Sequence, residues 1–173
     1  MTKLVPVALA ALLLCACAAQ PNLTTATASA ALAPTTANNA SGVVTFSKQS
    51  NGVRVEGEVR GLQPNAEHGF HIHEKGDCSS GDGMSTGGHF NPTAQPHGAH
   101  SQSEHHAGDL VSLQADGNGV ARFSYTSTTI TVGEGPTDII GRGLIVHRDA
   151  DDYRTQPTGN SGPRIACAVI AKG

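Results

Sequence analysis

The sequence predicts a single-domain all-β protein, built as a β-sandwich or a β-barrel, and three observations support this. The chain has 173 residues, enough for one domain with its own core and too few for two ordinary domains. It contains 21 Gly and 9 Pro, no Trp, and no long stretch with helical periodicity. About seven or eight short runs of strand-forming residues are separated by turn residues, which is typical of antiparallel β-architectures.

The predicted strands follow one another from about residue 27. Residues 27–34 alternate weakly, residues 43–49 are strand-like, and the sequence Ser-Asn-Gly at residues 50–52 predicts a tight hairpin turn. The next run gives the clearest signal, because Val53, Val55 and Val59 alternate with charged side chains as in a half-buried strand. Further strands are predicted at residues 67–74, 109–114, 120–126, 143–148 and 164–172.

The predicted strand at residues 67–74 contains two histidines one residue apart. Because successive strand side chains point to opposite faces, His71 and His73 project from one face and His68, Phe70 and Ile72 from the other. Such a pair is weak evidence for a metal site when it stands alone. A cysteine five residues after the second histidine is either a third ligand or has a different task.

A polar stretch at residues 76–108 is too poor in apolar residues to build its own core, so it needs something that orders it. His89, His97, His106 and Asp109 follow one another at intervals of 8, 9 and 3 residues. A single one of these histidines would be a surface residue by default. Together they predict a metal site, because metal ligation orders a loop and imidazole nitrogen favours zinc and copper.

Charge and composition exclude nucleic acid as an expected partner. The formal net charge is -3, and aromatic residues make up 3% of the chain. Lys and Arg are outnumbered and scattered, so there is no basic patch to bind phosphates.

The N-terminus resembles a bacterial lipoprotein signal peptide, predicted to cover residues 1–16. Lys3 precedes an apolar run at residues 4–14, and the small Ala16 stands directly before Cys17, the expected lipidation site. Cys15 fits this role less well because the bulky Leu14 precedes it. A plain secretory signal and a buried N-terminal element are the alternatives.

Cleavage before Cys17 would leave the lipidated cysteine with a short tether at residues 17–25, and a folded domain at residues 26–173. We therefore expect a bacterial envelope or periplasmic protein, held at the membrane through the lipid on Cys17. Cys78 and Cys167 remain in the mature chain, and in an oxidising compartment two thiols suggest one disulfide.

Five motifs stand in the order found in one known family: GFHIH, GGHFNP, HHAGDL, GRGLIVHRDADD and GPRIACAVI. The chain resembles copper,zinc superoxide dismutase from about residue 25 to its C-terminus. The resemblance implies a Greek-key, eight-stranded β-barrel related to the immunoglobulin-like sandwich, with long metal-binding and active-site loops. It also implies disproportionation of superoxide to dioxygen and hydrogen peroxide, with one copper and one zinc ion per subunit.

The resemblance assigns roles to individual residues. His89 would bridge both metals, Asp151 would hydrogen-bond His71 and His97, and Arg164 would stand at the mouth of the copper channel. Cys78 would form a disulfide with Cys167 rather than bind metal. His89 and Arg164 are thus the expected catalytic residues. The expected ligands are His71, His73, His89 and His147 for copper, and His89, His97, His106 and Asp109 for zinc.

Three histidines match no ligand position: His68, His100 and His105. We expect them to be surface or tautomer-flexible residues. His105 competes with its neighbour for the zinc role, but the three-residue step to Asp109 favours His106.

The chain also departs from the eukaryotic pattern. The segment after Asp152 is shorter than the charged loop of those enzymes, so Lys75, Arg148 or Arg154 would have to supply the charges that attract superoxide. The sequence is compatible with a homodimer, but these departures give no support for the dimer surface of the eukaryotic enzymes.

Two other functions fit the sequence less well than that of a dismutase. A cupin would need a glutamate three or four residues beyond the HxH pair, whereas Glu74 follows His73 directly. A metal buffer or chaperone would not need Arg164, and a copper-only relative would not need the complete zinc set.

Overall fold

Residues 28–173, which the computed structural model describes, form a curled antiparallel sheet that confirms the all-β prediction. Its strands lie in the order β5-β8-β9-β1-β2-β3-β7, with β10 beside β1, and β4 and β6 form a separate pair. The strands are β1 (Ala28–Pro34), β2 (Ser41–Gln49), β3 (Gly52–Arg60), β4 (Glu67–His68), β5 (Phe70–His73), β6 (Leu113–Gln114), β7 (Ala121–Ser127), β8 (Gly143–His147), β9 (Arg164–Val169) and β10 (Ala171–Lys172).

The β2–β3 hairpin forms where the sequence predicts it. Gln49 pairs with Gly52 across the turn, and Gly52 has a φ of 143°, a conformation that favours glycine. Val53, Val55 and Val59 are all buried. They pack into a core that also contains the large side chains of Phe46, Phe70, Leu144 and Ile170.

Three predicted strands differ from the observed ones. The run at 67–74 is interrupted at Gly69, the run at 109–114 shortens to β6, and the run at 164–172 divides into β9 and β10. Gly69 breaks its strand because its N–H donates to the carbonyl of Asp149 while its own carbonyl accepts from His147. A Cβ at Gly69 would lie 2.6 Å from the Ser161 hydroxyl, so any other residue at this position would require Ser161 to move.

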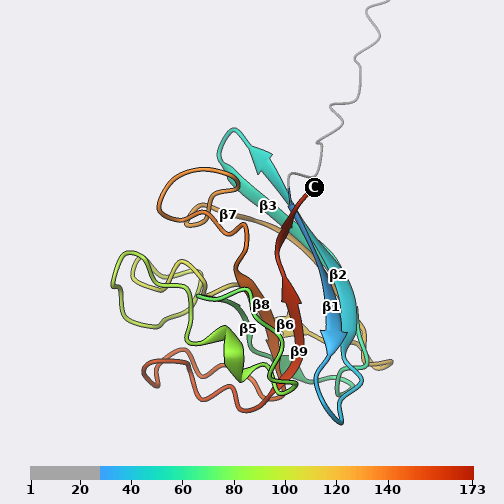
Figure 1. Cartoon of the computed structure of the whole chain (residues 1–173). Coiled ribbons are helices and arrows are strands. Elements are labelled where there is room, and N and C mark those ends of the chain that lie inside the picture. The colour runs from blue at the N-terminus through green and yellow to red at the C-terminus, as the bar shows by residue number, and fades with distance from the viewer. Residues whose placement is uncertain (1–27) are drawn as a thin grey trace, which may run out of the picture.

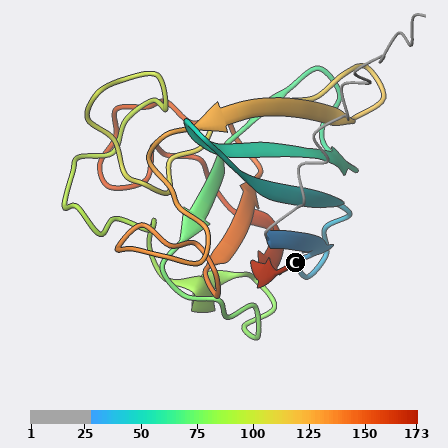
Figure 2. The same ribbon diagram turned by 90° about the horizontal axis from the view of Figure 1, so that it is seen from above.

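The long loops gather on one side of the sheet, next to β5 and β8 (Figure 1). The view from above shows the same arrangement, with β1, β2, β3 and β7 on the opposite side (Figure 2). The only helix among residues 28–173 is the short 3-10 turn η1 (Met84–Thr86). No helix in this part of the chain is long and apolar enough to cross a membrane. The predicted signal and tether at residues 1–25 lie outside the described residues.

Candidate metal centre

The loop between β5 and β6 leaves the edge of β5 and returns to it. Ile72 accepts a main-chain hydrogen bond from Phe90 at 2.8 Å and donates one to Gly108 at 2.9 Å. A Cβ at Gly108 would lie 2.2 Å from the Ile72 carbonyl oxygen, so only glycine allows this approach. These contacts place His89 opposite His73 and Asp109 opposite His71.

The first cluster consists of four buried histidines whose ligand atoms lie within 4.8 Å of one another: His71, His73, His89 and His147. Each ring turns one nitrogen into the cluster. His73 donates Nδ1–H to the Gly87 carbonyl at 2.9 Å, and His147 donates Nδ1–H to the Gly162 carbonyl at 3.0 Å. Because a carbonyl only accepts, these bonds leave the Nε2 lone pairs free to bind a metal. The buried nitrogens without a hydrogen-bond partner among residues 28–173 include His71 Nδ1, His73 Nε2, His89 Nε2 and His147 Nε2.

A second cluster places three imidazole nitrogens around one carboxylate oxygen of Asp109. The Oδ1 atom lies 2.8 Å from His89 Nδ1, 3.0 Å from His97 Nδ1 and 3.3 Å from His106 Nδ1. The Nδ1 atoms of His89 and His106 are 3.4 Å apart. Ligands about 2.0 Å from a tetrahedral zinc ion stand about 3.3 Å from each other. The second cluster therefore has the dimensions of a zinc site.

The two clusters share His89 and are linked a second time through Asp151. His89 offers Nδ1 to the second cluster, and its Nε2 belongs to the first. The Asp151 carboxylate, 5% exposed, lies 2.7 Å from His71 Nε2 and 2.9 Å from His97 Nε2. The orientation of one ring in each cluster is therefore fixed by a single carboxylate.

Burial and charge set the protonation states of the cluster groups in the metal-free protein. Burial lowers the pKa of His147 to about 3 and that of His89 to about 4, so both rings are neutral at physiological pH. Burial opposes ionisation of Asp109, yet hydrogen bonds from His106, His89 and His97 hold its pKa well below the ordinary value. Burial also lowers the pKa of His97, but Asp109 and Asp151 outweigh it and raise the pKa to about 9. In the metal-free protein His97 therefore carries a proton at neutral pH, and a metal ion bound at its Nδ1 would replace that proton.

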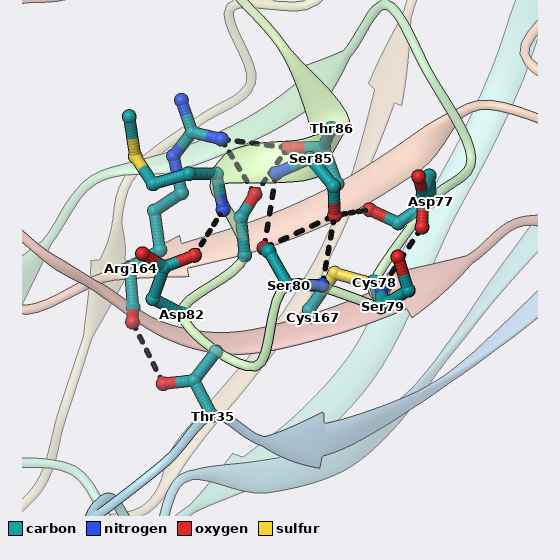
Figure 3. The surroundings of a disulfide bond; sticks show 12 residues. Thr35, Asp77, Cys78, Ser79, Ser80, Asp82, Ser85, Thr86, Arg164 and Cys167 are labelled. Atoms are coloured by element: carbon teal, nitrogen blue, oxygen red, sulfur yellow. Dashed lines mark hydrogen bonds between the residues drawn. A yellow bond between two sulfur atoms is a disulfide. The ribbon is translucent and has the colours of Figure 1, made fainter.

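The turn around η1 holds the guanidinium of Arg164 (Figure 3). Its Nη1 donates to the Gly83 carbonyl at 2.6 Å and to the Thr86 hydroxyl at 2.8 Å, and its Nη2 donates to the Gly87 carbonyl at 2.7 Å. That same Gly87 carbonyl accepts from His73. The Arg164 guanidinium and the His73 ring therefore donate to the same carbonyl oxygen.

The disulfide expected between Cys78 and Cys167 is present, with 6.0 Å between the Cα atoms (Figure 3). It connects the turn that contacts Arg164 to β9, the strand on which Arg164 lies. A disulfide fits an oxidising environment, either extracellular or periplasmic.

The expectation that His68, His100 and His105 are surface or tautomer-flexible histidines is wrong. His68 is 1% exposed and His105 is 6% exposed, while His100 is half-buried. Each ring places Nδ1 within hydrogen-bond distance of a main-chain carbonyl, so none is free to turn. The structure brings His106, and not His105, into the second cluster.

Several polar residues that support the clusters were not predicted from the sequence. Thr86 is fully buried beneath Arg164, while Tyr153 and Gln156 contact Asp151 and His97. Thr86 contacts a side chain 78 residues away, Tyr153 uses its own main-chain N–H, and Gln156 contacts main-chain groups of His97, and side-chain spacing gives no signal for any of these contacts.

The loops of this β-barrel build two adjoining imidazole-rich clusters that share one histidine. This arrangement defines a class of protein, the dinuclear metalloproteins that hold two different transition-metal ions. The model of the family copper/zinc superoxide dismutase (SODC) matches residues 40–170. The chain belongs to the copper/zinc superoxide dismutase family. Its all-histidine cluster fits copper, and its His/Asp cluster fits zinc.

Two relatives named Superoxide dismutase [Cu-Zn] cover most of the chain. The one from Paramecium bursaria Chlorella virus 1 is 42% identical over 135 residues, which are 75% of this chain and 71% of the relative. The one from Saccharomyces cerevisiae is 43% identical over 138 residues, 75% of this chain and 88% of the relative.

Solved structures support the Greek-key β-barrel. The clock protein EA4 superposes with a TM-score of 0.77 at 40% identity, over 86% of this chain and 95% of that one. A double mutant of a SOD-like protein from Bacillus subtilis superposes with a TM-score of 0.75 at 34% identity, over 83% and 96% of the two chains.

Proposed function

We propose that the protein disproportionates superoxide to dioxygen and hydrogen peroxide, the activity named in its relatives. One observation carries the proposal: four buried imidazole nitrogens without partners among residues 28–173 converge beside Arg164. In this proposal the first cluster, His71, His73, His89 and His147, holds copper, and the second, His89, His97, His106 and Asp109, holds zinc.

Copper held by the first cluster would supply a Cu(II)/Cu(I) couple for one-electron transfer to and from superoxide, and zinc held by the second cluster would be structural. The Arg164 guanidinium attracts the anionic substrate and orients it by donated hydrogen bonds. His89 would hold a proton at Nε2 while this nitrogen is not a ligand and would then pass it to the product, which supplies one of the two protons that peroxide needs. Asp151 keeps the rings of His71 and His97 in their binding orientations.

The test measures metal content and superoxide decay of the purified protein together with two variants. His147→Ala removes one of the four nitrogens, so we expect loss of copper and of activity while zinc stays bound. Arg164→Ala should keep both metals and slow the decay about tenfold or more, because the charge and donors for the anion are gone. If the wild type binds both metals but superoxide decays no faster than with free copper, the protein is a metal buffer instead.

We further propose that the enzyme protects the cell envelope, anchored by a lipid on Cys17, which is supported by the signal-like residues 1–16 and by the disulfide. Labelled fatty acid should appear on the wild type and not on Cys17→Ala, with the protein found in the periplasm. Equal labelling of both proteins would contradict the anchor. Sedimentation of the same samples determines whether the homodimer left open by the sequence forms.

A further inference from the structure

The loop between β8 and β9 lies against both clusters, and two of its residues have no role in the function proposed above. Asp151 sits in this loop and contacts one ring of each cluster. Tyr153 and Gln156 follow within the same loop. Their contacts show how the loop holds its carboxylate in place.

Tyr153 connects Asp151 to the body of the protein. Its main-chain N–H donates to Asp151 Oδ1 at 2.7 Å, the same oxygen that contacts His97. Its hydroxyl lies 2.5 Å from a Glu67 carboxylate oxygen and 2.8 Å from the Ser112 hydroxyl, so it donates to the first and accepts from the second. The side chain is therefore fixed at one end by β4 and the segment before β6.

The backbone of Tyr153 is in an uncommon conformation. Its φ of 57° lies in the left-handed region, which a bulky side chain avoids. Such a conformation persists only where its surroundings impose it, and here the N–H points at Asp151 as a result.

Gln156 contacts His97, the cluster residue whose ring lies against the Asp151 carboxylate. Its side-chain amide donates to the His97 carbonyl at 2.9 Å and accepts from the His97 N–H at 2.8 Å. A primary amide satisfies both groups in only one orientation, so the pairing is directional. His97 is thus held at its ring by Asp151 and at its main chain by Gln156.

Gly159 allows the loop to close over this contact. Its φ is 66°, and a Cβ at this position would lie 1.8 Å from Asp151 Oδ1 and 2.5 Å from His97 Nε2. The loop backbone therefore covers the Asp151–His97 pair directly.

We propose that Tyr153 and Gln156 are positioning residues that set the orientation of Asp151 and His97 and so determine how tightly zinc is held. The inference rests on the zinc site of the proposed function. Neither side chain ligates the ion. Tyr153 acts through the Asp151 carboxylate, and Gln156 acts through the main chain of His97.

The experiment compares Tyr153→Phe and Gln156→Ala with matched controls that remove the same groups elsewhere, Tyr125→Phe and Gln63→Ala. Zinc affinity is measured by chelator competition, and Co(II) placed in the zinc site reports ligand geometry through its visible absorption bands. We expect each loop variant to lower zinc affinity about tenfold or more, the usual effect of removing a partner that orients a ligand. The Co(II) bands should shift in both, whereas the controls should stay within about twofold of wild type.

Gln156→Glu adds a directional test. The carboxylate still accepts from the His97 N–H but faces the His97 carbonyl with an oxygen, so it should weaken zinc binding at least as much as Gln156→Ala. The Gln156 side chain is exposed, so its variants test the inference even if Tyr153→Phe fails to fold.

His97→Ala separates this inference from the site assignment. If His97→Ala still binds zinc at full affinity, the assigned zinc site is wrong. If His97→Ala loses zinc while both loop variants keep wild-type affinity and Co(II) bands, only the positioning role is refuted. Equal losses in the loop variants and in their controls would also refute it, since the effect would then be a general loss of stability.

Discussion

Three histidines outside the clusters each donate Nδ1–H to a main-chain carbonyl of a cluster residue. Because a carbonyl oxygen only accepts, Nδ1 must be the protonated nitrogen of each ring. These bonds fix the backbone from which the cluster side chains project. The pairs are His68 with His147 at 2.9 Å, His100 with Asp109 at 3.0 Å, and His105 with His106 at 2.7 Å.

His100 allows this role to be tested with nearly isosteric side chains. The amide nitrogen of Asn occupies the position of His Nδ1, whereas that of Gln occupies the position of Nε2. We expect His100→Asn to keep the bond to the Asp109 carbonyl, and His100→Gln to lose it at a cost of about 1 to 3 kcal/mol. Urea unfolding of the metal-loaded variants measures the difference. Equal stability of the two variants would show that the bond contributes nothing.

The sequence predicted the cluster residues and Asp151, which orients two of their rings, but not the other residues that orient them. Spacing and family motifs were enough to select His71, His89 and Asp109, because ligands are side chains with recognisable chemistry. His68 and Gln156 act on main-chain carbonyls, and any residue presents a carbonyl. Their roles depend on which loops meet, and this emerges only in the folded chain.

The strands show the same limit at the scale of elements. β2 and β3 were predicted closely because apolar and polar side chains alternate along β3 while one face is buried. The break at Gly69 was not predicted, because it depends on Ser161 and Asp149 in a distant loop. Side-chain periodicity describes burial within one strand and does not report where another segment crosses it.

The disulfide connects two such elements, and its removal should affect both stability and activity. Cys78 and Cys167 are 89 residues apart, for which chain entropy gives about 4 to 5 kcal/mol of stabilisation. The double variant Cys78→Ser/Cys167→Ser should lose up to this amount in urea unfolding. It should also react about 10- to 100-fold more slowly with superoxide, because the turn that holds Arg164 is released.

Ser79→Ala, in the same turn, is the control for the disulfide and should match the wild type in both measurements. If the double variant kept wild-type rates while losing stability, the disulfide would serve folding alone.

At the scale of the whole molecule, the net charge of -3 opposes the approach of an anion, while Arg164 attracts it locally. Arg148, one of the three residues expected to supply steering charge, is paired with Asp149 at 2.8 Å, so its charge is largely offset. We therefore expect the rate constant of the wild type to fall as NaCl is raised, since screening acts over about 8 Å at physiological ionic strength. In Arg164→Gln the dependence should vanish or reverse. An unchanged salt dependence in this variant would show that other charges attract the substrate.

The stability of the metal-free protein should depend on pH through the buried rings of the first cluster. Burial lowers the pKa of His73 well below 6.5 and that of His147 to about 3, whereas in the unfolded chain both rings titrate near 6.5. Between these values only the unfolded chain binds the protons, so each ring should lower stability by about 1.4 kcal/mol per pH unit as pH falls below 6.5.

His97 has the opposite sign and acts in a different range. Its pKa of about 9 means that the folded protein keeps a proton that the unfolded chain has lost, so its contribution should disappear as pH rises from 6.5 through 9. Stability of the chelator-treated protein should therefore peak near neutral pH. Urea unfolding from pH 4.5 to 9.5 measures this dependence of stability on pH. In His147→Asn the loss of stability below pH 6.5 should be less steep by about 1.4 kcal/mol per pH unit, because one titrating ring is absent. An acid side that is equally steep in this variant would show that other groups cause the loss.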